Sequence, residues 1–174
     1  TTRPNDLLPT IRSRCQRIEF KVGGAVLTRP DWLAWRDDYR AWLDRLAAGV
    51  TDKTAIAAQL MAAYGLITRF DAVLAAITAE KVRGQKEALP GELDDEEVVA
   101  VEIGIANGLR LKLFAEIEQA TRDYALPRLL AEGSAPRRAL IAAAEKLEHA
   151  TGLLRLNLNE SVALEDFLLS SLRI

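Results

Sequence analysis

Hydrophobic residues recur every three or four positions along most of the chain after residue 30, which is the period of an amphipathic α-helix. The clearest stripe predicts a helix over residues 30–48, and one face of it carries Trp32, Trp35, Tyr39, Trp42 and Leu46. Stacking of nucleic-acid bases on such aromatics needs interleaved positive charge. Here four aspartates accompany three arginines between residues 31 and 45. We therefore assign the aromatic stripe to the protein core.

The next periodic stretch predicts a helix that begins after a cap at Thr51 or Asp52 and ends near Lys86. Gly65 either interrupts this helix or permits close approach of a neighbour. The stretch is therefore one long helix or two helices joined between residues 65 and 68. Its expected apolar face consists of Ile56, Leu60, Ala63, Ile67, Phe70, Val73, Leu74 and Ile77.

An acidic run at residues 92–97 follows a loop that contains Pro90 and Gly91. Such a run can bind a cation, but acids also collect in the first turn of a helix, where they complement the partial positive charge. We assign the run to the start of a helix that ends near Tyr124, before Leu126 and Pro127. The side chains expected to be buried are Val98, Val101, Ile105, Leu109, Leu113 and Ile117.

A further helix is predicted from Ser134, which serves as its cap with Pro136 in the first turn. His149, the only histidine of the chain, lies among polar neighbours in this stretch. It has no second histidine or nearby cysteine with which to bind a metal, so we expect an exposed surface residue. The face expected to be buried consists of Leu140, Ala144, Leu147, Ala150 or Thr151, and Leu154.

Composition supports a helical protein, because alanine and leucine dominate and only 6% of the residues are aromatic. The single cysteine excludes an internal disulfide framework and favours a reducing compartment. No apolar run approaches the ~20 residues that span a bilayer, since Gln59, Arg69 and Asp71 interrupt residues 54–79. We expect a soluble, cytoplasmic protein with no membrane partner.

Charge is distributed unevenly along the chain. The formal net charge of -2 gives no overall electrostatic footprint for nucleic acid. Residues 1–29, by contrast, carry six basic and two acidic side chains, a local net charge of +4. This excess suits an anionic neighbour such as a nucleotide phosphate, and a charged loop region is the commoner explanation.

The first twenty residues carry an ordered set of short motifs. A Thr-Thr-Arg-Pro start is followed by leucines at helical spacing, by a Ser-Arg-Cys triplet, and by alternating Ile18 and Phe20. This order resembles the delta-prime subunit of the bacterial DNA polymerase III clamp loader. The leucine-rich stretch at residues 153–169, with its asparagine turn and Ala-Leu-Glu helix, also resembles the end of clamp-loader subunits.

The resemblance implies a chain in two parts. Residues 1–25 correspond to the terminal helix and strand of an AAA+ ATPase domain, and residues 26–174 to an all-α helical bundle, the clamp-loader collar domain. Gly23 and Gly24 agree with a boundary near residue 25. We expect the sequence to be the C-terminal fragment of a longer protein, in which the lid domain is either lost or merged with the helix that follows.

Arg14 is the arginine-finger candidate that the resemblance implies, acting in trans on a neighbouring ATPase subunit. Phosphoryl transfer spreads charge over the equatorial oxygens, and a planar, permanently charged guanidinium offers paired donors to that charge. Ser13 and Cys15 are motif neighbours without a chemical role: Ser13 suits a helix end, and Cys15 a small buried position. The alternative is that Arg14 is a basic residue at a helix C-terminus.

The sequence contains no Gly-x-x-x-x-Gly-Lys-Ser/Thr loop and no strand ending in paired acids. We therefore expect no cofactor and no catalysis in this fragment, with ATP and magnesium bound at the neighbouring subunit. The implied partners are the clamp-loader delta and gamma/tau subunits, with the sliding clamp and primed DNA engaged through the complex. Two alternatives stay open: a gamma/tau-type ATPase subunit, and a helical interaction scaffold unrelated to ATPases.

Overall fold

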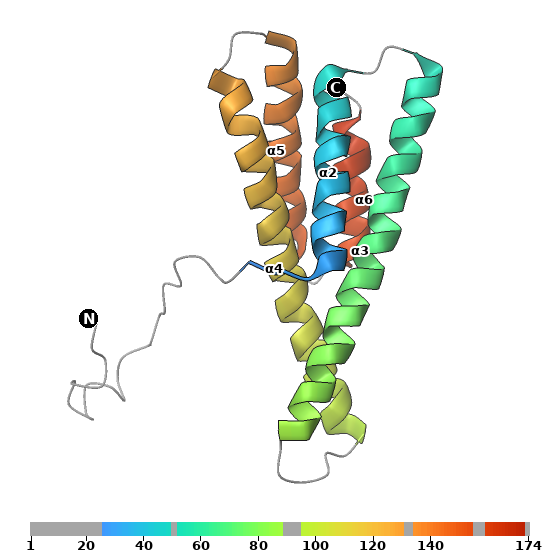
Figure 1. The fold of residues 1–174 in the computed structure, drawn as a ribbon, viewed down its shortest axis with the longest axis vertical. Helices are drawn as coiled ribbons and strands as arrows, with labels where there is room; N and C mark the ends of the chain where they lie inside the picture. Colours follow the sequence, from blue (N-terminus) through green and yellow to red (C-terminus); the bar gives the residue numbers. More distant parts are fainter. Residues whose placement is uncertain (1–25, 50–51, 89–94, 131–133, 155–158, 173–174) are drawn as a thin grey trace, which may run out of the picture.

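A computed structural model describes residues 26–49, 52–88, 95–130, 134–154 and 159–172 (Figure 1). Within these ranges the chain is all-helical, as predicted, and contains no strand. The helices are α2 (Pro30–Ala48), α3 (Lys53–Ala88), α4 (Asp95–Leu130), α5 (Ser134–Leu154) and α6 (Glu160–Ser171). The expected ATPase piece at residues 1–25 lies outside the described residues.

Helix α2 packs against α3, α4 and α5. The long helices α3 and α4 pack side by side and extend together beyond the other three, at the lower end of Figure 1. Helix α6 packs between α5 and α3. The bundle thus has a compact part built from all five helices and a projecting pair.

The aromatic stripe of α2 forms the core, as predicted, and its five members are at most 5% exposed. Successive rings stack: the ring centroids of Trp32 and Trp35 are 4.9 Å apart, those of Trp35 and Tyr39 5.4 Å, and those of Tyr39 and Trp42 5.9 Å. Phe70 of α3 and Phe167 of α6 meet these rings at steep angles. Aromatic pairs of this kind add about 0.5–1.5 kcal/mol beyond area burial.

Helix α3 begins after Asp52, whose side chain accepts a hydrogen bond from the Ala55 backbone N–H at 2.8 Å. It then runs without a break to Ala88. A Cβ atom added at Gly65 would meet nothing within 4 Å. Neither predicted role of Gly65 is therefore right, because it neither breaks the helix nor makes room for a neighbour.

The buried face of α3 starts later than the periodicity predicts. Ala63, Phe70 and Ile77 are at most 3% exposed, as expected, whereas Ile56 is 53% exposed and Leu60 38%. The prediction is wrong for these two residues because no described helix covers that side of the first turns of α3. Sequence periodicity shows that one face of a helix is apolar, but it does not show how far along that face the neighbouring helices extend.

Helix α4 starts in the acidic run, as predicted, but passes through Pro127 and ends at Leu130. Inside a helix a proline removes the N–H that would donate to the carbonyl four residues earlier, here that of Asp123, yet α4 continues for three residues beyond Pro127. The Arg128 side chain donates to the Tyr124 carbonyl at 3.0 Å. Of the residues expected to be buried, Leu109, Leu113 and Ile117 are buried, while Val98, Val101 and Ile105 are only partly buried.

Helices α5 and α6 complete the core with Leu140, Leu147, Leu154, Leu164 and Phe167. Ala144 was predicted to be buried but is exposed. His149 is exposed, as predicted. The Asn159 side chain caps α6 by accepting hydrogen bonds from the backbone N–H groups of Ser161 and Val162.

Candidate functional site

The residues predicted to form the site, Ser13, Arg14 and Cys15, lie outside the described residues. The arginine finger therefore stays a prediction. The structure instead shows how the chain that follows these residues joins the bundle, and which bundle surfaces are left uncovered.

Glu116 of α4 holds the beginning of the described chain. Its carboxylate accepts hydrogen bonds from the Leu27 backbone N–H at 2.9 Å and from Trp32 Nε1 at 2.7 Å. The Arg36 guanidinium lies 3.9 Å from the same carboxylate, whose side chain is only 12% exposed. Leu27, which precedes α2, and Trp32, in the first turn of α2, are thus both held on α4.

A second set of contacts involves Arg29, which pairs with Asp31 at 2.9 Å and also with Glu80 of α3. The hydrogen bond from Arg29 lowers the pKa of Asp31. Together with Glu116, these pairs tie the start of α2 to two neighbouring helices. The start of the described chain is therefore held by both α3 and α4.

The first turns of α3 carry an uncovered apolar surface, which we call the α3 stripe. Met61 is 71% exposed and Tyr64 44%, and the Tyr64 hydroxyl donates to Glu165 of α6 at 3.2 Å. Residues 53–64 contain one charged side chain, Lys53. The stripe consists of Ile56, Ala57, Leu60, Met61 and Tyr64.

Helix α3 is also more apolar than the sequence pattern suggested. Among the described helices it alone, over Lys53–Gly84, is long and apolar enough to cross a membrane by length and composition. Only 33% of its most apolar stretch is buried inside the bundle. The exposed residues of α3 include those of the α3 stripe.

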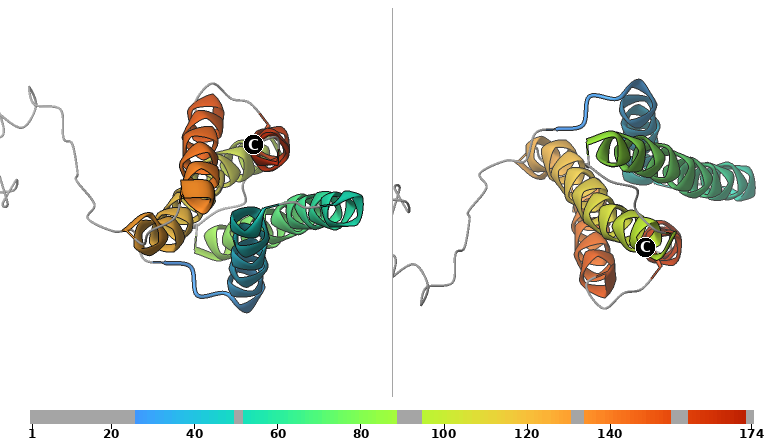
Figure 2. Two further views of the ribbon diagram at one scale, coloured as in Figure 1. Left: turned by 90° about the horizontal axis from the view of Figure 1, so that it is seen from above. Right: turned by 90° about the horizontal axis from the view of Figure 1, so that it is seen from below.

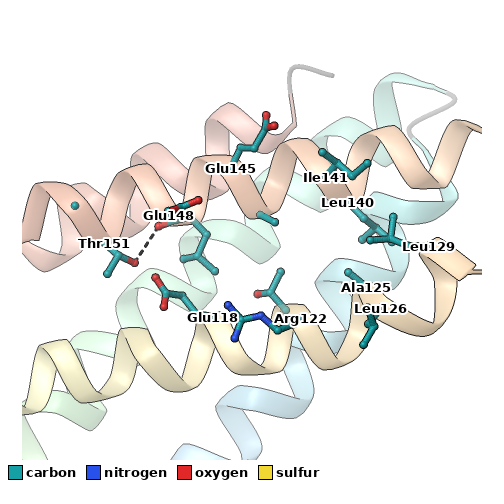
Figure 3. Close-up of a pocket in the computed structure, with 14 residues that line it drawn as sticks. Glu118, Arg122, Ala125, Leu126, Leu129, Leu140, Ile141, Glu145, Glu148 and Thr151 are labelled. Carbon is teal, nitrogen blue, oxygen red and sulfur yellow. Dashed lines mark hydrogen bonds between the residues drawn. The ribbon is translucent and has the colours of Figure 1, made fainter. Parts of the chain in front are cut away.

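A groove with a volume of about 620 Å³ lies between α4 and α5 (Figure 3). Its apolar lining includes Leu126, Leu129, Leu140 and Ile141, of which Leu126 is 56% and Ile141 42% exposed. Its charged lining residues are Glu118, Arg122, Glu145 and Glu148. Three acids against one base give this α4/α5 groove an acidic character.

The α3 stripe and the α4/α5 groove lie on opposite sides of the bundle. Figure 1 shows the start of α3 on the right and the α4/α5 pair on the left, with α2 and α6 between them, and the view from above in Figure 2 agrees. A molecule with two different apolar surfaces on opposite sides can make contacts in two directions at once.

Sequence periodicity missed both surfaces because it assigns apolar residues to a core. One signal was available: residues 56–64 are apolar around most of the helix, as in a helix that is buried on all sides. Within the described ranges, no group of three or more His, Cys, Asp or Glu side chains is arranged to hold a metal ion.

No protein-family model, curated protein or solved structure matches the chain.

Proposed function

We propose that the chain is the C-terminal part of a delta-prime-like subunit of the DNA polymerase III clamp loader. In this function the subunit does not hydrolyse ATP itself. It organises the pentamer through its helical bundle, as a collar domain, and supplies Arg14 in trans to a neighbouring ATPase subunit. The observation that carries the proposal is the order of motifs in residues 1–20, followed directly by a helical bundle.

The two apolar surfaces support a collar role. Domains that pack side by side in a ring use heterologous contacts, in which each copy offers two different surfaces. The α3 stripe and the α4/α5 groove are two such surfaces on opposite sides of the bundle. Their exposed leucine, isoleucine and methionine side chains suit burial against neighbouring helical domains.

The anchoring of residues 27–32 supports a link between the collar and the finger. Arg14 precedes Val26 by only twelve residues in the sequence, and the chain after Val26 is held by Glu116. A fixed attachment limits where the preceding segment can reach. In the proposed complex, which is cytoplasmic, ATP and magnesium bind at the neighbour, and clamp and primed DNA are engaged by the assembly.

The test is Arg14→Ala in the full-length subunit, reconstituted with the delta and gamma/tau subunits. We expect ATP hydrolysis at the neighbouring subunit's site to fall by about 10³-fold or more, while sizing shows an intact complex. Arg17→Ala, three residues further on, is the matched control and should leave the rate unchanged. An unchanged rate for Arg14→Ala would refute the arginine finger.

The gamma/tau alternative is tested on the same full-length subunit alone. If that subunit binds and hydrolyses ATP by itself, it is an ATPase of the gamma/tau type. The delta-prime-like proposal expects no hydrolysis by the isolated subunit.

The α3 stripe also favours a second candidate, a helical interaction scaffold with no ATPase partner, because an uncovered apolar surface of this kind binds other proteins without further chemistry. This candidate predicts assembly through the bundle surfaces and no effect of Arg14→Ala on any ATPase rate.

A further inference from the structure

We propose that Glu116 of α4 positions the segment that carries Arg14, by holding the chain at Leu27, thirteen residues after the arginine. This role rests on the proposed function and deepens it, because it assigns a positioning residue that lies in the helical bundle and outside the Ser-Arg-Cys motif. Residues 27–29, which precede α2, are called the strap.

The Glu116 carboxylate is itself fixed by the core. Its two oxygens accept separate hydrogen bonds, one from the Leu27 backbone N–H at 2.9 Å and one from Trp32 Nε1 at 2.7 Å. The Arg36 guanidinium lies 3.9 Å from the carboxylate, and the Glu116 side chain is only 12% exposed. If Glu116 turned to solvent, the fully buried Trp32 indole would lose its acceptor, which is costly. The carboxylate is therefore a fixed point to which the Leu27 N–H is bonded.

The strap is held more strongly by α4 than by α3. Hydrogen bonds to an ionised carboxylate are roughly twice as strong as those between neutral groups, and Glu116 is largely shielded from water. Arg29 of the strap also pairs with Glu80 of α3, but these two side chains are 31% and 66% exposed. Exposed ion pairs contribute little and are screened by salt. We therefore assign the position of the strap to the hydrogen bond between Leu27 and Glu116.

Helix α4 connects the strap with the proposed subunit boundary. The α4 lining of the α4/α5 groove begins at Glu118, two residues after Glu116, which is about 3 Å along the helix axis. In the proposed function a neighbouring helical domain packs against this groove. The helix that meets the neighbour also holds the strap, so the segment with Arg14 starts at a fixed place relative to that neighbour.

Release of the strap has two effects of very different size. It lengthens the tether between Arg14 and the bundle from thirteen residues, at Leu27, to sixteen, at Pro30. The effective concentration of a tethered group falls roughly as the −3/2 power of the tether length, which gives a loss of about 1.4-fold. Misplacing a catalytic group by about 1 Å, in contrast, costs about 10²-fold in rate. Positioning therefore predicts a far larger loss of rate than tethering does.

The test is Leu27→Pro in the full-length subunit, reconstituted with the delta and gamma/tau subunits. Proline has no backbone N–H, so the change removes the hydrogen bond of the strap and leaves Glu116, Trp32 and Arg36 unaltered. Val26→Pro is the matched control. It introduces the same ring one residue earlier, where the N–H makes no hydrogen bond within the described ranges.

We expect Leu27→Pro to lower ATP hydrolysis at the neighbouring subunit's site by about 10-fold or more at saturating ATP. The ATP concentration that gives the half-maximal rate should not change, because the strap does not bind the nucleotide. Sizing should show an intact complex, and Val26→Pro should leave the rate unchanged.

The hydrogen bond itself is checked on the 174-residue chain by amide exchange in NMR. The Leu27 amide should exchange slowly although it lies before the first described helix, since it donates to a nearly buried carboxylate. Circular dichroism should give the same helix content for both proline variants, because both sites precede α2.

Four results would overturn the positioning role. The Leu27 amide could exchange as fast as an unbonded amide. Leu27→Pro could lower the rate by less than about twofold, which tethering alone explains. Val26→Pro could lower the rate as much as Leu27→Pro does. The Leu27→Pro complex could dissociate, which would mean that the strap serves assembly.

The positioning role and the proposed function fail separately. If Arg14→Ala abolishes hydrolysis at the neighbour and Leu27→Pro leaves it unchanged, only the role of Glu116 is refuted. If Arg14→Ala leaves hydrolysis unchanged, the arginine finger is refuted, whatever the exchange rate of the Leu27 amide.

Discussion

At the scale of single residues, the core of this bundle contains a short hydrogen-bonded chain of hydroxyl groups. The Thr121 hydroxyl donates to the Ile117 carbonyl at 2.7 Å and lies 2.7 Å from the Tyr39 hydroxyl. Because the single Thr121 proton is used in this way, Tyr39 is the donor to Thr121. Complete burial raises the pKa of Tyr39, so the phenol stays protonated.

This arrangement predicts unequal costs for removing the two partners. Thr121→Val leaves the buried Tyr39 hydroxyl without an acceptor and should lower the free energy of unfolding by about 1–3 kcal/mol. Tyr39→Phe removes a donor but leaves Thr121 bonded to Ile117, and should cost about 1 kcal/mol. Urea unfolding of the two variants measures the difference.

Thr151→Val is the matched control for this pair. The Thr151 hydroxyl donates to the Leu147 carbonyl at 2.9 Å, with the same spacing along the helix but without a tyrosine partner. Its effect should stay within about 0.5 kcal/mol. A larger cost for Tyr39→Phe than for Thr121→Val would contradict the assigned direction of the hydrogen bond.

At the scale of helices, the sequence predicted both ends of α2 correctly. It also predicted which face of α2 is buried, because five large residues recur there at helical spacing. The predictions failed where the packing of the helices differed from what the local sequence pattern indicates. Pro127 was expected to end α4, yet the helix continues to Leu130, and the Arg128 side chain donates to the Tyr124 carbonyl. Ile56 and Leu60 were expected in the core, yet the neighbouring helices do not cover them.

Gly65 offers a direct test of the unbroken α3. Since an added Cβ atom meets nothing within 4 Å, Gly65→Ala should raise the free energy of unfolding by about 0.5–1 kcal/mol through a lower entropy cost. Gly49→Ala is the contrasting variant, because Gly49 has a φ of 79° that strains an alanine. It should destabilise the protein. Destabilisation by Gly65→Ala in urea unfolding would instead indicate a close helix contact.

The predicted site at Ser13, Arg14 and Cys15 stays a prediction, because these residues lie outside the described ranges. The α3 stripe and the α4/α5 groove required the structure, since exposure depends on which helices are adjacent and where each one ends.

At the scale of the whole molecule, burial is concentrated in one part of the bundle. Residues 79–84 of α3 and 98–108 of α4 include no buried side chain. This projecting pair of helices therefore relies on few apolar contacts, whereas the part around α2 has a continuous core.

We expect this difference to appear in amide hydrogen exchange. Residues 79–84 and 98–108 should exchange faster than residues 63–78 and 109–125, because regions with few buried contacts open locally at lower free energy. Mass spectrometry of peptides from these segments measures the rates. Equal protection along α4 would show that the projecting pair is stabilised by contacts beyond those described.

The early position of α2 in the chain has a consequence for synthesis. Its aromatic and polar partners come late in the chain: Thr121 and Glu116 lie 82 and 84 residues after Tyr39 and Trp32. A ribosome adds about 5–20 residues per second, so α2 emerges several seconds before the helices that cover it. Phe167, which covers Tyr39 and Trp42, arrives last. A chain cut short before α6 would expose these rings, a signal that chaperones and proteases can recognise.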